Sequence, residues 1–345
     1  MDNFESYRHI RKISAARGAR APDAWAAAYV SLRKALGFRS PKTGEILRHL
    51  LRFMRDRGIV SFNQVDRNLA MAWLHSGSPQ EITINQRLAT MRGFFRYLVS
   101  LGAARGSIWD SIPHRRTKRF IPYVFSLAEI RTILDHLHRG IDTSAPRLAR
   151  TRAAYYVMVH TLYACGLRLG ELCRLRIADI SFERSLFVIK DTKFGKTRLV
   201  PFNSRTRELV NGYLDRHRPS DDGAPRDAPL FLNFRRRRFI RVKFSDYFRK
   251  MCTAIGIYRR KETRGMTVHG GTTPHALRHT FAVHRLLKWY EEKADVNAKL
   301  PLLATYMGHS DYRDTQKYLR VLPRFIDIAG KLFADKFEAP LKDLE

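Results

Sequence analysis

The sequence predicts a mostly α-helical chain with one small antiparallel β-sheet, organised as two domains. Apolar side chains recur at helical spacing through most of the 345 residues. Two short segments, 186–189 and 198–202, alternate like strands instead and enclose a polar turn at 190–197. The stretch 103–124 breaks the periodicity and contains Pro113 and Pro122. Together these observations predict a helical domain, a linker and an α+β domain, in that order.

The first domain, expected at residues 20–105, is predicted to contain four helices. Their apolar faces lie at 24–36, after Pro41, at 62–75 and at 84–101. Proline suits the first position of a helix, so Pro41 indicates a start there. The fourth helix carries an apolar and aromatic stripe made of Leu88, Met91, Phe94, Phe95 and Leu98. We interpret this stripe as the domain core rather than as a surface on which bases stack.

The expected linker, residues 106–122, contains a run of basic residues: Arg115, Arg116, Lys118 and Arg119. A run of charge is usually a solvated piece of chain. Between two basic domains it is equally able to lie along a phosphate backbone. Both interpretations stay open from the sequence.

The second domain is expected at residues 123–335, followed by a tail at 336–345. Ser126 and Glu129 form a capping-box pattern before a helix, and Gly166 is placed to end a second helix at 147–165. Further helices are predicted at 208–214, 244–254, 274–289, 302–307, 314–319 and 325–333. With the two strands, this gives a domain that is mostly α.

Lys and Arg number 64 against 32 Asp and Glu, a formal net charge of +32, and the excess is present on both sides of residue 120. This balance indicates a polyanionic partner, and nucleic acid is the obvious one. A basic protein of the ribosomal kind is disfavoured because the chain is rich in core-forming residues. The first residues show no signal peptide, and no segment reaches the ~20 apolar residues that span a bilayer, so we expect a cytoplasmic location.

Three cysteines, Cys165, Cys173 and Cys252, do not make a disulfide framework. Their apolar surroundings predict buried, reduced thiols.

Six residues have spacings that suggest phosphoryl transfer: Arg168, Lys193, His275, Arg278, His309 and Tyr318. Two guanidinium groups can hold the non-bridging oxygens of one phosphodiester. A phenol can attack the phosphorus if a neighbour takes its proton, and a lysine or histidine can protonate the departing oxygen. This set can cut DNA without a metal, a nucleotide or another cofactor.

The set also resembles the tyrosine recombinase (phage integrase) family. The matching motifs are Gly-Leu-Arg-Leu-Gly-Glu at 166–171, His-Ala-Leu-Arg-His at 275–279, and Gly-His at 308–309 with a tyrosine nine residues after the histidine. The resemblance implies a helical core-binding domain followed by a catalytic domain. It also implies a partner, duplex DNA with a specific recombination site, on which a homo- or hetero-tetramer assembles; no membrane is involved.

The resemblance further implies a role for each residue. Tyr318 attacks the scissile phosphate and leaves a 3′-phosphotyrosyl link and a free 5′-hydroxyl. Arg168, Arg278 and His309 stabilise the charge that grows on the phosphorus. His275 is the expected proton acceptor for Tyr318, and Lys193 the general acid for the leaving oxygen.

The lysine assignment leaves alternatives. Aligning the strand at 198–201 with the family puts Lys193 at the catalytic position, but Lys190 and Lys196 stand three residues on either side. The triplet Gly195-Lys196-Thr197 superficially resembles a phosphate-binding loop. The earlier glycine of that motif is absent and the context is a hairpin, so we reject nucleotide binding.

His279 follows His275 by one helical turn, and we assign it to packing within its helix. The pair has the spacing of zinc ligands, but no third ligand accompanies it, so no metal site is predicted. Residues 259–273, with Gly270 and Gly271, are unusually polar for this point in the family and form either an ordered insert or a loop that faces DNA.

A second basic cluster is formed by Arg235, Arg236, Arg237 and Arg238. A turn between short strands would expose it, and in a domain that cuts DNA we favour phosphate contact over solvated charge.

The sequence therefore predicts a site-specific DNA recombinase or integrase, for a mobile element rather than a housekeeping role. The alternatives are a chromosome- or plasmid-dimer resolvase, a type IB topoisomerase and a non-catalytic DNA-binding protein. The intact set of six residues disfavours the last, and the separate helical domain disfavours the topoisomerase.

Overall fold

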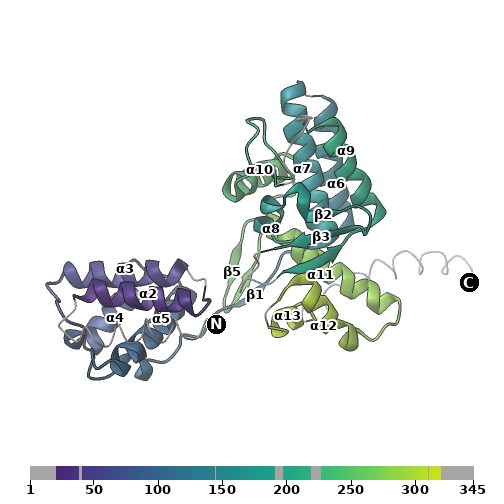
Figure 1. Cartoon of the computed structure of the whole chain (residues 1–345). Helices are drawn as coiled ribbons and strands as arrows, with labels where there is room; N and C mark the ends of the chain where they lie inside the picture. Colours follow the sequence, from purple (N-terminus) through teal and green to yellow (C-terminus); the bar gives the residue numbers. More distant parts are fainter. Residues whose placement is uncertain are drawn as a thin grey trace, which may run out of the picture. The chain divides into compact units, whose positions relative to one another are not determined.

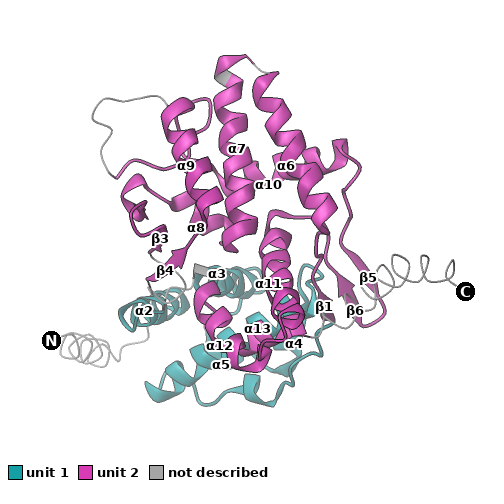
Figure 2. Cartoon of the chain, turned by 90° about the vertical axis from the view of Figure 1, so that its right-hand side faces the viewer, with its two compact units in different colours: residues 1–118 teal, residues 119–345 magenta. Residues whose placement is uncertain are grey.

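The computed structural model describes residues 21–38, 41–143, 145–190, 197–218, 227–309 and 311–319 (Figure 1). The chain divides into two compact units, Met1–Lys118 and Arg119–Glu345 (Figure 2). Among the described residues, no helix is both long enough and apolar enough to cross a membrane. Lys193, the helix expected at 325–333 and the tail at 336–345 all lie outside the described residues.

The first unit is helical. It contains α2 (Pro22–Ala35), α3 (Pro41–Arg55), α4 (Arg67–His75) and α5 (Glu81–Ser100). The predicted helix at 62–75 is wrong at its start, because the Asp66 carboxylate accepts the Leu69 N–H at 2.7 Å and so begins α4 there. The stripe on α5 is buried as predicted, in a core with Trp73 and Trp109.

The segment assigned to a linker, 106–122, is ordered and divides between the two units. Trp109 is fully buried in the first core, and Arg92 donates to the carbonyls of Trp109 and Ile112. Asn85 exchanges two hydrogen bonds with the backbone of Arg115, both 2.8 Å long. The last residues form strand β1 (Arg119–Ile121) of the second unit. The basic side chains of the run are exposed.

Three long helices lie side by side in the second unit: α6 (Leu127–Asp142), α7 (Pro146–Cys165) and α9 (Ser204–Arg216) (Figure 1). The predicted capping box begins α6, since Ser126 accepts the Glu129 N–H and Glu129 accepts the Ser126 N–H. All three cysteines are buried and free, as predicted. The short α8 (Leu169–Arg174), which the sequence did not predict, and α10 (Arg241–Ala254) also pack on this core.

The predicted sheet is confirmed as an antiparallel sheet in the order β2–β3–β4: β2 (Ile180–Ser181), β3 (Leu186–Ile189) and β4 (Arg198–Pro201). A second sheet was not predicted. In it, β1 pairs parallel with β6 (Thr267–His269), which pairs antiparallel with β5 (Glu262–Arg264). The polar stretch 259–273 is therefore an ordered hairpin. At Gly271 a side chain would overlap the backbone at Arg259 and Lys261, so a glycine is needed there.

Three helices complete the unit: α11 (Pro274–Glu291), α12 (Val296–Met307) and α13 (Arg313–Leu319). Thr273 caps α11 by accepting the Ala276 N–H, and Pro274 occupies its first turn. A separate apolar cluster joins the three helices and includes Phe281, Leu303, Met307 and Tyr318. The buried end of α13 thereby holds Tyr318 against α11.

Candidate active site

The C-terminal ends of α7 and α12 each carry a glycine in the left-handed conformation, Gly166 at φ +59° and Gly308 at φ +68°. A Cβ at Gly166 would overlap the Phe281 ring, so only glycine fits both the backbone angle and the space. Helix ends leave carbonyl groups without partners in the helix, and they carry the negative end of the helix dipole. Here arginine side chains donate hydrogen bonds to those carbonyls.

Arg278, in the second turn of α11, is 1% exposed. It donates from Nη1 to the Gly166 carbonyl at 2.6 Å and from Nη2 to the Met307 carbonyl at 2.7 Å. Burial and the neighbouring Arg168 charge lower its pKa to about 10, which still leaves the guanidinium charged at neutral pH. Two helix ends thus fix one buried cation.

Arg168 lies directly before α8 and is half-buried. Its Nη2 donates to the Gly308 carbonyl at 2.9 Å, and its Nη1 to Glu171 Oε1 at 2.9 Å. Arg168 therefore ties the end of α12 to the start of α8. Its charge lowers the pKa of Arg278, and two neighbouring guanidinium groups favour an anion between them.

Glu171 is 4% exposed and is held by a second arginine that the sequence analysis missed. Arg198, on β4, donates from Nη1 and Nη2 to the two carboxylate oxygens at 2.9 and 2.8 Å. Burial raises the pKa of Glu171, but the hydrogen bonds and charge of Arg198, with the N–H groups of Arg168, outweigh it and lower the pKa to about 2. Through these contacts Glu171 orients both Arg168 and Arg198.

Tyr318 lies on α13 and is 5% exposed. Its hydroxyl is 2.9 Å from Nδ1 of His279. Burial raises the pKa of Tyr318 to about 12, although Arg278 and Arg168 oppose the rise. The His309 ring stacks on the Tyr318 ring with centroids 6.3 Å apart, and His309 Nδ1 is bonded to Thr315 Oγ1 at 2.7 Å.

Three histidines face this centre, and all are neutral near pH 7. Burial and the nearby arginine charges lower the pKa of His309 to about 4. Burial, His275 and Arg278 lower that of His279 to about 3. Desolvation by the surrounding protein, together with the charges of Arg278 and Arg168, lowers the pKa of His275 to about 4, although the residue is exposed to solvent. Neutral imidazoles can accept a proton or donate a hydrogen bond to an anion.

The contact between His279 and Tyr318 differs from our assignment of His279 to packing within its helix. The Tyr318 hydroxyl is bonded to His279, and the His275 ring lies edge-on against the His279 ring, with centroids 4.5 Å apart. The spacing of one helical turn between the two histidines was the signal that could have revealed this contact. The role of His275 as proton acceptor for Tyr318 stays a prediction.

A cavity of about 590 Å³ opens beside His275 and His279. Basic side chains of α10 and of the segment before β5 contribute to its walls: Arg249, Arg259, Arg260 and Lys261. Its basic lining carries the charge to attract a phosphate backbone.

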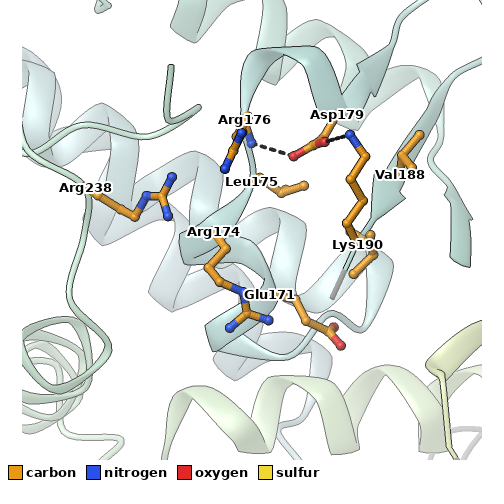
Figure 3. A pocket seen from close by; sticks show the side chains of 9 residues that line it. Glu171, Arg174, Leu175, Arg176, Asp179, Val188, Lys190 and Arg238 are labelled. Atoms are coloured by element: carbon orange, nitrogen blue, oxygen red, sulfur yellow. Dashed lines mark hydrogen bonds and ion pairs between the residues drawn. The ribbon is translucent and has the colours of Figure 1, made fainter. Parts of the chain in front are cut away.

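Of the three candidate lysines, Lys190 is the one that the structure describes. It lies in a second cavity beside Glu171, Arg174 and Arg238, and its ammonium group is 2.8 Å from the buried carboxylate of Asp179 (Figure 3). Asp179 also accepts the backbone N–H of Arg176 at 3.0 Å. Lys190 is thus paired with Asp179 and not with a residue of the catalytic set.

The four arginines at 235–238 lie on a turn organised by Asn233. Its side-chain oxygen accepts the N–H groups of Arg235 and Arg237, and its own N–H donates to the Arg237 carbonyl. Arg236 has a positive φ of +57°. Arg235, Arg236 and Arg237 are exposed, while Arg238 is half-buried and lines the cavity of Lys190.

Comparisons with known proteins identify the family to which this chain belongs. The model of the phage integrase family matches residues 124–324. A putative integrase/recombinase of Sinorhizobium fredii, y4rB, is 31% identical over 90% of this chain and 96% of its own length. Tyrosine recombinase XerC of Pelobacter propionicus is 30% identical over 71% of each chain.

Two solved structures share the fold. The Tn1549 transposon integrase in complex with circular intermediate DNA has a TM-score of 0.59 at 19% identity, covering 87% of this chain and 95% of that one. The XerH recombinase bound to difH substrate has a TM-score of 0.58 at 18% identity, covering 92% and 84%. With a family model that matches more than half of the chain and a relative that covers nearly all of it, this chain belongs to the phage integrase family and is a tyrosine recombinase.

Proposed function

We propose that this recombinase cuts and rejoins duplex DNA at a specific site through a covalent bond between Tyr318 and a 3′-phosphate, in the service of a mobile element. The observation that supports it most is the position of the Tyr318 hydroxyl. It lies in one centre with neutral histidines and with two arginines that are held at the ends of α7 and α12.

In the proposed reaction the Tyr318 oxygen forms a bond to phosphorus while its proton passes to a neighbouring histidine. The bond between phosphorus and the 5′-oxygen breaks, and that oxygen takes a proton from a general acid. Negative charge grows on the non-bridging oxygens, where Arg168, Arg278 and His309 donate hydrogen bonds. The arginines are fixed before DNA arrives, so little reorganisation is needed at the moment of reaction.

We assign the general acid to Lys193. The pairing of Lys190 with Asp179 supports this choice, because a lysine held by a buried carboxylate would first have to break that ion pair. The reaction conserves the energy of the phosphodiester, so a 5′-hydroxyl from another strand can attack the phosphotyrosine and rejoin the DNA. No metal, nucleotide or other cofactor is required by this chemistry.

DNA contact is proposed for two basic segments outside the centre: Arg115, Arg116, Lys118 and Arg119, and Arg235, Arg236, Arg237 and Arg238. Their exposure supports it, since seven of these eight residues are exposed at the surface, where phosphates of DNA can approach. Both segments would add affinity without reading sequence.

The mobile-element role is favoured by the relatives. The integrase/recombinase relative aligns over 90% of this chain, whereas the XerC relative aligns over 71%. The Tn1549 integrase, which shares the fold, is named for a transposon and was solved with circular intermediate DNA. We also propose, as the family resemblance implies, that the enzyme acts in the cytoplasm as a tetramer on paired sites. Dimer resolution is the second candidate, and the XerC relative favours it.

Covalent trapping tests the proposal. The protein is incubated in EDTA with a library of nicked duplexes. Each duplex has a randomised region long enough to hold a whole recombination site. DNA joined to protein is then recovered and sequenced. We expect enrichment of one sequence with two inverted arms, and peptide mapping should locate the adduct at Tyr318. Tyr318→Phe should give no adduct, while Tyr312→Phe, which alters an exposed tyrosine nearby, should trap DNA normally. An adduct at Tyr312, or a requirement for a metal, contradicts the proposal.

A further inference from the structure

His279 holds the nucleophile in this structure, although it is not one of the six residues of the catalytic set. Its Nδ1 lies 2.9 Å from the Tyr318 oxygen, and the residues come from different helices, α11 and α13. Among the described residues, His279 is the hydrogen-bond partner of the Tyr318 hydroxyl. His309 makes its own bond to Thr315 and meets Tyr318 through ring stacking.

The position of His279 is fixed from several sides. The Phe120 ring of β1 lies 6.2 Å from it and the His275 ring 4.5 Å from it, measured between centroids. Its neighbour Arg278 is anchored to two helix ends, so this turn of α11 has little freedom. A side chain held in this way can define where the Tyr318 oxygen rests.

The bond orients the phenol rather than deprotonating it. Burial keeps both partners neutral, because it raises the pKa of Tyr318 and lowers that of His279. With Nδ1 unprotonated, the Tyr318 hydroxyl donates to it and both groups stay uncharged. A resting site of this kind keeps the nucleophile aligned and uncharged in the DNA-free protein.

We propose that His279 is a positioning residue for cleavage: by accepting the hydrogen bond of Tyr318 at Nδ1 it fixes the attacking oxygen inside the protomer that carries it. The proposal rests on the function proposed above, because it concerns the nucleophile of that reaction. It makes a specific claim about one ring nitrogen, and amide side chains can test it. The amide group of asparagine falls near Nδ1, whereas that of glutamine falls near Nε2.

The same helix offers a matched control. His284 is half-buried on α11, and its Nδ1 lies 3.1 Å from the hydroxyl of Tyr163. This second histidine–tyrosine pair has the same two side chains but lines a different cavity, with Leu134, His160 and Ala164, which neither Arg168 nor Arg278 lines. A substitution of His284 therefore measures how the loss of a histidine–tyrosine hydrogen bond affects α11 when the nucleophile is not involved.

The experiment measures single-turnover formation of the covalent complex at saturating DNA, with DNA affinity measured separately. His279→Leu should slow the reaction by about 10- to 100-fold, the effect of a misplaced nucleophile, with little change in affinity. His279→Asn should recover most of the rate and His279→Gln should not. His284→Leu should react like the unchanged protein. An unchanged rate in His279→Leu, or equally slow reactions in His279→Leu and His279→Asn, overturns the proposal.

A second measurement needs no DNA and separates this proposal from the proposed function. 3-Fluorotyrosine is placed at position 318, and its ¹⁹F resonance is followed in the DNA-free protein. His279→Leu should shift or broaden the resonance, His279→Asn should restore a single sharp signal, and His284→Leu should leave it unchanged. A resonance that does not respond to His279→Leu contradicts the inference whatever the protein does to DNA. Failure of covalent trapping with a normal ¹⁹F response contradicts the proposed function instead.

Discussion

Glu171 and Arg198 form a pair of parallel hydrogen bonds, Nη1 to Oε1 at 2.9 Å and Nη2 to Oε2 at 2.8 Å. The carboxylate also accepts the backbone N–H and Nη1 of Arg168, so one buried acid joins α8, β4 and an arginine of the centre. Arg198 further donates from Nε to the Tyr306 carbonyl on α12. These contacts connect the stability of the domain to the geometry of its active site.

Glu171→Gln should therefore lower the free energy of unfolding by about 3 kcal/mol at neutral pH, as expected when one partner of a buried ion pair is removed. The folded pKa of about 2 lies below the ordinary value of 4.5, so this contribution is present above pH 4.5 and is lost as pH falls toward 2. Urea unfolding at several pH values checks this. A stability difference from the unchanged protein that stays constant down to pH 2.5 contradicts it.

Gly166→Ala should destabilise the domain and slow cleavage, because the new methyl group would meet the Phe281 ring and the backbone angle is unfavourable for alanine. The matched control is Gly256→Ala at the end of α10, where φ is +75° and no atom lies within 4 Å of the added Cβ. The control should cost about 1 kcal/mol for backbone strain alone. Gly166→Ala should cost a further 1–3 kcal/mol, roughly, from overpacking. Equal thermal unfolding of the two variants would show that the contact with Phe281 does not matter.

Arg278→Ala should reduce single-turnover cleavage by about 100-fold or more while changing DNA affinity little, because the guanidinium acts on charge that develops during the reaction. Arg235→Ala is the contrasting variant. Its exposed side chain should contribute to affinity and to salt dependence, lowering the salt slope by about one unit, and cleavage at saturation should be normal. Weak binding with normal cleavage by Arg278→Ala would assign that arginine to binding alone.

Lys193→Ala should be strongly impaired on ordinary DNA and largely restored on a substrate with sulfur at the 5′-bridging position. The leaving thiolate has a much lower pKa than an alcohol and needs no general acid. Lys190→Ala should cleave ordinary DNA well, since Lys190 is engaged by Asp179. If the sulfur substrate restores cleavage by Lys190→Ala or Lys196→Ala but not by Lys193→Ala, the restored variant identifies the lysine that is the general acid.

The helices, and most of the residues that the structure gathers around Tyr318, could be predicted because their signals are local. Periodicity located α5 and α11, and the pattern at Ser126 located the start of α6. The helix predicted at 62–75 is wrong at its start, because Phe62–Gln64 form a separate short 3-10 helix and the Asp66 side chain caps α4. An aspartate that caps a helix is easily mistaken for a residue of the helix interior when apolar residues stand on both sides of it.

Other features depend on contacts between distant residues and have no local signal. The hairpin of β5 and β6 needs β1, which lies about 150 residues earlier in the sequence, to complete its sheet. Arg198 was counted as part of a strand pattern, and its bond to Glu171 forms only when β4 meets α8. The bond between His279 and Tyr318 likewise requires α11 and α13 to pack together. The role of Lys193 stays a prediction, because the structure does not describe that residue.

The parallel pairing of β1 with β6 has a mechanical consequence. The chain enters the second unit at β1, which is attached by bonds such as Arg119 N–H to the Met266 carbonyl and Gly270 N–H to the Ile121 carbonyl, both 2.8 Å long. A pull on the chain at Lys118 runs along these strands, so all the bonds between them share the tension in shear instead of opening one after another. The residues after β6 lead directly into α11, and any tension that the strands transmit reaches the helix that carries His275 and His279.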